Sequence, residues 1–245
     1  DKLLGIAQVH ETLQYRRGNT SEDLNNPSGA AFNANVPSLA TMTTASLNVL
    51  ARNTNGFAVM IEGGAIDWAG HDSNLPRQIE ESMDFDDAVQ AAVDWINAYD
   101  PTWSETLLVV TSDHETGDLW GPGRDFDPIV DHGVGVIPGH SWQSSGHTNS
   151  LVPLYAQGAG AERFASKVIG IDENMVSGYA LPEGGFDGRY VDNSAVYEVI
   201  SRAVIVPEPT ALAVLLLGSL IFVNGGRRYL RERCLLEKAD LAARR

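Results

Sequence analysis

The sequence predicts an α/β fold, in which helices cover a mostly parallel β-sheet. Residues 57–61 (FAVMI) form an apolar run that ends at an acid and two glycines, as a buried strand of a parallel sheet does. Residues 77–98 carry apolar side chains at helical spacing, and residues 107–111 (LLVVT) form a second apolar run. Strand, helix, strand is the unit of an α/β sheet, whose ligands gather at the carboxyl ends of the strands.

The flanking elements follow from local signals. The opening segment to about Ser38 is polar and turn-rich and predicts a loop, after which Ser38 can cap a helix that ends near residues 53–56. Residues 119–145 are rich in Gly, Pro, Asp and Trp and too long for a simple connector, which suggests a loop of a functional site. Residues 150–158 predict another apolar strand, and residues 192–204 a last helix with a side-chain cap at its start.

Composition limits the kind of protein. With 245 residues, 43% hydrophobic and 20% charged, the chain can form one sizeable core. A formal net charge of -15, from 32 acidic and 17 basic residues, repels phosphate backbones and argues against a nucleic-acid partner. The single cysteine, Cys234, excludes internal disulfides and thiolate zinc sites, so any metal must be held by His, Asp and Glu. The start has neither an initiator Met nor a signal segment, so we expect a chain cut from something longer.

Candidate metal ligands follow both predicted strands. Glu62 ends the first apolar run, and Asp67 and His71 lie four residues apart, which places both on one face of a helical turn. Asp113 and His114 follow the second run and can converge on one ion only if the backbone bends there. Carboxylate with imidazole suits Zn²⁺, whereas one carboxylate with water suits Mg²⁺. Each residue alone also fits a turn or a surface role, but their repetition at strand ends indicates a two-metal hydrolase, by analogy with phosphoryl-transfer sites.

Three further histidines also bear on the site. His147 is a third candidate ligand, just before the predicted strand at residues 150–158. His132 and His140 lie in the long loop, where they either help to bind metal or substrate or are simply solvated.

Three motifs follow one another along the chain: residues 59–74 (VMIEGGAIDWAGHDSN), 107–117 (LLVVTSDHETG) and 144–164 (SSGHTNSLVPLYAQGAGAERF). In this order and separation they resemble the carboxyl-terminal half of bacterial alkaline phosphatases, and the resemblance spans roughly residues 1–205. It implies a three-layer α/β/α sandwich around a mostly parallel sheet, here incomplete at its amino-terminal side.

The resemblance also implies two zinc ions and one magnesium ion. The implied ligands are Asp67, His71 and His147 for the first zinc, Asp113 and His114 for the second zinc, and Glu62 for magnesium. The implied reaction is hydrolysis of phosphate monoesters through a phosphoserine, with the two zinc ions clamping the oxygens of the transferred group.

We assign no catalytic side chain. The family's nucleophilic serine, bridging aspartate and phosphate-binding arginine belong to its amino-terminal half, so we expect these 245 residues alone to be inactive. Two kinds of alternative stay open: a related phosphodiesterase, sulfatase or phosphonate hydrolase that shares the metal scaffold, and a non-catalytic surface protein whose metals only stabilise the fold. Family members are often dimers, so a homodimer is also open.

The carboxyl-terminal segment, residues 206–233, starts with VPEP, continues with an apolar stretch at residues 210–223 and ends in an arginine cluster. These three parts resemble a PEP-CTERM sorting signal, which residues 234–245 would follow as a cytoplasmic tail. This implies a short transmembrane helix, processing by an exosortase-type enzyme, and an extracytoplasmic protein delivered to the cell envelope or extracellular matrix. The alternative is a plain membrane anchor, although the stretch is shorter than the roughly 20 residues of a full span.

Overall fold

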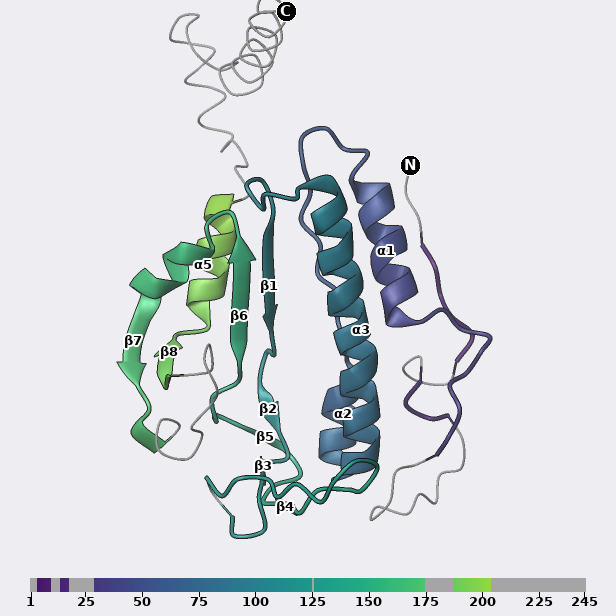
Figure 1. Cartoon of the computed structure of the whole chain (residues 1–245), viewed down its shortest axis with the longest axis vertical. Helices are drawn as coiled ribbons and strands as arrows, with labels where there is room; N and C mark the ends of the chain where they lie inside the picture. The colour runs from purple at the N-terminus through teal and green to yellow at the C-terminus, as the bar shows by residue number, and fades with distance from the viewer. Residues whose placement is uncertain (1–3, 10–13, 18–28, 125, 175–186, 204–245) are drawn as a thin grey trace, which may run out of the picture. The chain divides into compact units, whose positions relative to one another are not determined.

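Figure 1 shows the chain in a computed structural model, which describes residues 4–9, 14–17, 29–124, 126–174 and 187–203. All of these belong to one compact unit of the chain. The segments interpreted as a sorting signal and a cytoplasmic tail lie outside the described residues. Within the described residues, no helix is both long enough and apolar enough to cross a membrane.

Three helices pack together beside the strands (Figure 1). They are α1 (Leu39–Leu50), α2 (Ala65–His71) and α3 (Leu75–Tyr99), and both α1 and α2 contact α3. Ser38 caps α1 and Asn74 caps α3, each by accepting a hydrogen bond from the backbone N–H three residues further on. Both predicted helices are therefore confirmed, although α1 ends at Leu50 and not near residues 53–56, and α3 starts two residues before the predicted range of 77–98.

Within the described residues, the strands form four two-stranded sheets. The pairs are β1 (Leu107–Thr111) with β6 (Leu154–Gly158), β2 (Glu115–Thr116) with β5 (His147–Thr148), β3 (Leu119–Trp120) with β4 (Ser141–Trp142), and β7 (Val168–Ile171) with β8 (Arg189–Val191). The 3-10 helix η1 (Ala161–Lys167) contacts both β6 and the last described helix, α5 (Ser194–Ala203). Strands β1 and β6 and helix α5 were all predicted from the sequence.

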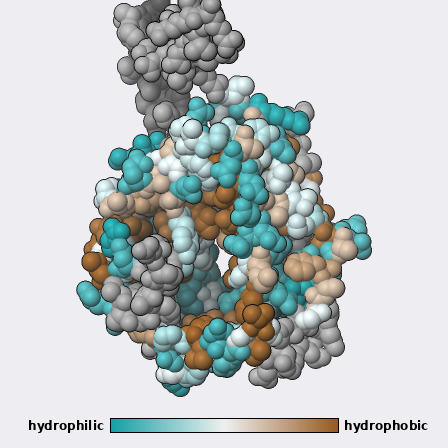
Figure 2. Space-filling model, in the orientation of Figure 1, coloured by the Kyte–Doolittle hydropathy of each residue, from teal (hydrophilic) through white to brown (hydrophobic). Residues whose placement is uncertain are grey.

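The α/β class is confirmed, but the sheet differs from the mostly parallel one that we expected. Every strand pair in the described part of the chain is antiparallel. Residues 57–61 do not form the predicted strand, and Val59 and Met60 are 43% and 86% exposed. An apolar run becomes a strand only when a neighbour accepts its backbone hydrogen bonds, and β1 pairs with β6 instead. Figure 2 shows apolar side chains at the surface of the face in view, which is hollowed near its middle.

A buried cluster of charges ties the opening segment to α3. Arg17 is buried, donates from Nη1 to Oε1 of Glu81 at 2.6 Å, and also pairs with Glu80. Arg77, also buried, donates to Oε2 of Glu80 at 2.9 Å and to the carbonyl of Arg17 at 3.1 Å. Burial raises the pKa of Glu81 against the opposing effect of Arg17, and burial also lowers the pKa of Arg77. The predicted loop at residues 14–17 is therefore held to the helix by two cations and two carboxylates.

Asp100 organises the turn between α3 and β1. Its carboxylate accepts hydrogen bonds from the backbone N–H groups of Glu105, Ser104 and Thr106 at 2.9, 3.1 and 3.0 Å. These bonds, that of Glu105 first, lower the pKa of Asp100. A lowered carboxyl pKa stabilises the folded chain above the unfolded-state pKa, and this stabilisation disappears as pH falls through the folded-state pKa.

We expect the change Asp100→Asn to lower the Tm at pH 7 because the amide accepts these bonds less strongly than the carboxylate. The deficit should shrink as pH falls toward the lowest value at which the chain stays folded, because wild-type Asp100 then takes up a proton. Thermal unfolding across this pH range tests the prediction, with exposed Asp86→Asn on α3 as the control. A Tm deficit that does not change with pH would contradict it.

Candidate metal centre

Helix α2 places Asp67 and His71 on one face, as their spacing predicted. Oδ1 of Asp67 lies 3.5 Å from Nε2 of His71. The opposite face of the helix is buried through Ala65 and Ala69, which pack against Tyr15 of the opening segment. The phenol oxygen of Tyr15 lies 3.3 Å from the carbonyl of Trp68 and also donates to the carboxylate of Asp72, which follows the last residue of the helix. This packing fixes the direction in which the two candidate ligands point.

The turn before α2 depends on a close approach of α3. A Cβ added to Gly63 would lie 2.9 Å from the ring of Phe85, a distance that real Cβ atoms do not show. Gly63 therefore lets Phe85 of α3 contact the backbone there.

The β2–β5 pair brings His147 to the same place. Its register sets His147 opposite Thr116 and Thr148 opposite Glu115. The carboxylate of Glu115 accepts hydrogen bonds from the hydroxyl of Thr148 at 2.5 Å and from the backbone N–H of Asp118 at 2.6 Å. Residue 147 is thereby fixed beside residues 115–118, although it is 80 residues away from Asp67 in the sequence.

Gly117 fastens the segment that leads into β5. Its N–H donates to the carbonyl of Gly146 at 3.0 Å, and its own carbonyl accepts from the N–H groups of Gln143 and Ser144. Its φ of +94° suits glycine, and a Cβ there would lie 2.4 Å from the ring of Trp142. Gly117 is thus required both by its positive φ and by the close packing of the Trp142 ring.

Three ligand atoms converge in a near-regular triangle. Nε2 of His147 lies 3.2 Å from Oδ1 of Asp67 and 3.0 Å from Nε2 of His71. The third side, from Oδ1 of Asp67 to Nε2 of His71, is 3.5 Å. A tetrahedral zinc ion with ligands at about 2.0–2.1 Å separates them by about 3.3–3.4 Å. Two imidazole nitrogen lone pairs at 3.0 Å also repel each other unless a cation or proton lies between them. The spacing and the donor types both fit a zinc ion.

His71 is held in the state that metal binding needs. Its Nδ1 lies 2.7 Å from the carbonyl oxygen of Ser145, which can only accept a hydrogen bond. In the neutral ring this contact places the proton on Nδ1, which leaves the lone pair of Nε2 for the triangle.

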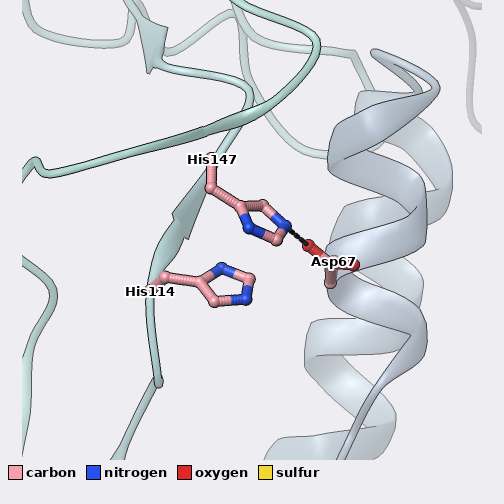
Figure 3. Close-up of side chains that lie close together, drawn as sticks. All are labelled: Asp67, His114 and His147. Carbon is pink, nitrogen blue, oxygen red and sulfur yellow. Dashed lines mark hydrogen bonds and ion pairs between the residues drawn. The ribbon is translucent and has the colours of Figure 1, made fainter.

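The second candidate pair lies directly beside the first set. The ring of His114 stacks on the ring of His147, with centroids 3.6 Å apart and planes inclined by 24°. Ligand atoms of Asp67, His114 and His147 all lie within 4.8 Å of one another, and Figure 3 shows these side chains pointing toward each other. Nε2 of His114 is 3.3 Å from Oδ2 of Asp113, whose side chain is 84% exposed. The backbone bends at residues 113–114, shortly after β1, as the convergence of Asp113 and His114 on one ion requires.

Five of the six predicted ligands thus gather in one cluster. Glu62 is exposed, and no contact in the described part of the chain links it to the histidines, so its role stays a prediction. His132 and His140 instead lie within hydrogen-bond distance of loop carbonyls, those of Ile137 and Pro138, at 3.1 and 2.8 Å.

Thr116 also belongs to this cluster, although its residue type did not predict it. Its hydroxyl lies 2.5 Å from Oδ1 of Asp67 and 3.3 Å from Nδ1 of His114. Threonine is not a usual zinc ligand, so a search for ligand types passes over it. Its position two residues after His114, in extended backbone where alternate residues share a face, is the signal that could have found it.

Comparison with known proteins identifies the family. Residues 2–125, half of the chain, match the family model described as alkaline phosphatase, and the chain therefore belongs to the alkaline phosphatase family. It is 39% identical over 158 residues to an alkaline phosphatase of Escherichia coli (strain K12), covering 61% of this chain and 32% of that protein. Over 82 residues it is 40% identical to alkaline phosphatase 3 of Bacillus subtilis (strain 168), covering 34% and 17%.

The solved structures that match include two alkaline phosphatases. The alkaline phosphatase from the Antarctic bacterium TAB5 is 31% identical, with a TM-score of 0.42 over 51% of this chain and 35% of that one. A cold-active alkaline phosphatase from Shewanella sp. is 23% identical, with a TM-score of 0.45 over 54% and 47%. The chain spans about a third or less of the length of the curated relatives it matches.

Proposed function

We propose that the chain forms the zinc-binding half of a metal-dependent phosphomonoesterase. The observation that carries the proposal is the triangle of Asp67, His71 and His147, whose side lengths of 3.0 to 3.5 Å suit one zinc ion. Asp113 and His114 would hold the second zinc, and Glu62 a magnesium ion. Membership of the alkaline phosphatase family supports phosphate monoesters as the substrate class.

The chain's own residues would fix the geometry of the reaction. When bound, two zinc ions supply Lewis-acid stabilisation of the attacking and leaving oxygens in a phosphoryl transfer. The carboxylate of Asp67 offsets positive charge at the first site, and the carbonyl of Ser145 keeps the Nδ1 proton of His71 turned away from it. Stacking of His114 on His147 sets the distance between the two sites.

Catalysis would need further groups. A serine nucleophile, a bridging aspartate and a phosphate-binding arginine are implied by the family but match no motif of this chain. We therefore propose that these residues act together with a polypeptide segment that supplies those groups, which would also complete the three-layer sandwich. Residues 57–61, in which Val59 and Met60 are exposed, would then pair with a strand of that segment.

The test combines metal analysis with an assay. We expect the 245-residue chain to bind zinc without hydrolysing p-nitrophenyl phosphate, and the chain extended by the coding sequence upstream of Asp1 to do both. If the extended chain hydrolysed a phosphate diester faster than p-nitrophenyl phosphate, it would be a phosphodiesterase. If it hydrolysed a sulfate ester faster, it would be a sulfatase. Zinc without any hydrolysis by either form would favour a protein in which the metals only stabilise the fold, and absence of zinc would overturn the proposal.

We also propose that the protein acts outside the cytoplasm. The support is the likeness of residues 206–233 to a PEP-CTERM signal, with an exosortase-type enzyme as the processing partner and the cell envelope or matrix as destination. One matched relative is named membrane-bound alkaline phosphatase, from Bombyx mori. Fractionation of cells that express the chain with and without residues 206–245 tests this, and identical distribution of both forms would contradict it.

A further inference from the structure

We propose that Thr116 is a positioning residue that couples the two metal sites through its single hydroxyl group. Its two hydrogen-bond partners are Asp67, a ligand of the first proposed zinc, and His114, a ligand of the second. The inference rests on the proposed function, because it assigns Thr116 a role toward those ligands.

The direction of the hydrogen bonds follows from counting protons. A hydroxyl has one proton to donate, and the carboxylate of Asp67 can only accept, so the bond of 2.5 Å uses that proton. Nδ1 of His114 is then the donor toward the oxygen of Thr116, at 3.3 Å, and it shares its proton with the carbonyl of Glu115 at the same distance. The hydroxyl thus places a proton on Nδ1 and leaves Nε2 as the ring nitrogen that faces Oδ2 of Asp113.

The same hydroxyl aligns the carboxylate of Asp67. The oxygen that accepts from Thr116 is Oδ1, which is also the atom in the triangle with His71 and His147. A carboxylate rotates readily about its terminal torsion, so a fixed donor on one lone pair of Oδ1 directs the other lone pair.

The packing around Thr116 prevents the hydroxyl from turning elsewhere. The residue is 9% exposed, and its Cγ2 and carbonyl face the backbone of Gly70, where an added Cβ would be 3.0 Å from both. Threonine has restricted χ1 rotamers, so a methyl group seated against α2 fixes where the hydroxyl points. Valine has the same shape, which allows the hydroxyl to be removed without leaving a cavity.

The two sites should not depend equally on this hydroxyl. Nδ1 of His114 has a second acceptor, the carbonyl of Glu115, also at 3.3 Å. Among the described residues, by contrast, the hydroxyl of Thr116 is the one side-chain donor other than histidine that bonds Oδ1 of Asp67. Loss of the hydroxyl should therefore weaken the first site more than the second.

Zinc titration of the 245-residue chain against a chromophoric chelator tests the inference. We expect Thr116→Val to lower zinc affinity at the first site about 10- to 100-fold, and that of the second site less. Thr116→Ser keeps the hydroxyl and should retain most of the affinity, even if it lowers thermal stability. Thr43→Val is the matched control, because it removes a buried hydroxyl that donates to the carbonyl of Leu39 within α1.

The outcomes separate the inference from the proposed function. Wild-type zinc affinity at both sites in a folded Thr116→Val chain would overturn the role of Thr116 while leaving the zinc sites in place. An equal loss in Thr116→Ser and Thr116→Val would also overturn it, since the hydroxyl would then not be the cause. A wild-type chain that binds no zinc would overturn the proposed function itself.

Discussion

Replacing Asp67 by alanine is expected to remove zinc from the first site. Asp67 supplies the one carboxylate of the triangle, and its Oδ1 lies within 3.5 Å of both histidine nitrogens. Without it, a divalent cation would meet two neutral imidazoles and no local negative charge from this set. Because loss of a residue that only supports a ligand costs about 10- to 100-fold in metal affinity, loss of a ligand should cost at least about 100-fold.

Zinc content by mass spectrometry measures this effect directly, and hydrolysis of p-nitrophenyl phosphate by the upstream-extended protein measures its consequence. Both should fall to near the background. Asp86→Asn, an exposed carboxylate on α3, controls for the general loss of one negative charge. An unchanged zinc stoichiometry in Asp67→Ala would refute the assignment of the first site.

His147→Ala should have a comparable effect for a different reason. Its ring is both a corner of the triangle and the surface on which His114 stacks. Its loss should therefore weaken both zinc sites, whereas Asp67→Ala should act chiefly on the first. Two-site binding curves distinguish these patterns, and loss confined to one site in His147→Ala would contradict the arrangement.

The sequence predicts those parts of the fold whose signals are local. Helix α1 follows from apolar spacing and its cap Ser38, helix α3 from apolar spacing, and β1 and β6 from short apolar runs. Residues 57–61 have the same kind of run but no strand, because strand formation depends on a partner that lies elsewhere. Pairing direction likewise depends on which strands meet, so the antiparallel pairing could not be seen from either strand alone.

The candidate site divides in the same way. The pairing of Asp67 with His71 follows from their spacing on one helical turn, which α2 confirms. His147 was assigned to them through the family resemblance, because the contacts that bring it near belong to β2, β5 and the turn at Gly117. Thr116 escaped notice because its role depends on two hydrogen bonds and not on its residue type.

Replacing Arg17 by alanine is expected to lower the free energy of unfolding more than any other substitution proposed for this chain. Arg17 is buried and hydrogen-bonded to Glu81, which is itself only 6% exposed, and to Glu80. Removing one partner of a buried ion pair leaves an uncompensated charge, which typically costs about 3–5 kcal/mol in the free energy of unfolding. Arg17 also connects residues 14–17 to α3, so its loss should loosen the segment that carries Tyr15 against α2.

Urea-induced unfolding of Arg17→Ala tests this, with exposed Arg52→Ala as the control that should change stability by no more than about 0.5 kcal/mol. The loss should depend on pH in a defined direction. Burial already raises the pKa of Glu81 above its ordinary 4.5, and without Arg17 that pKa should rise further.

A carboxyl with a raised folded-state pKa contributes stability below its unfolded pKa and loses it as pH rises through the folded one. The defect of Arg17→Ala should therefore be smallest under acidic conditions, where Glu81 takes up a proton, and should grow toward neutral pH. A loss no larger than that of Arg52→Ala at every pH would show that this cluster does not stabilise the fold.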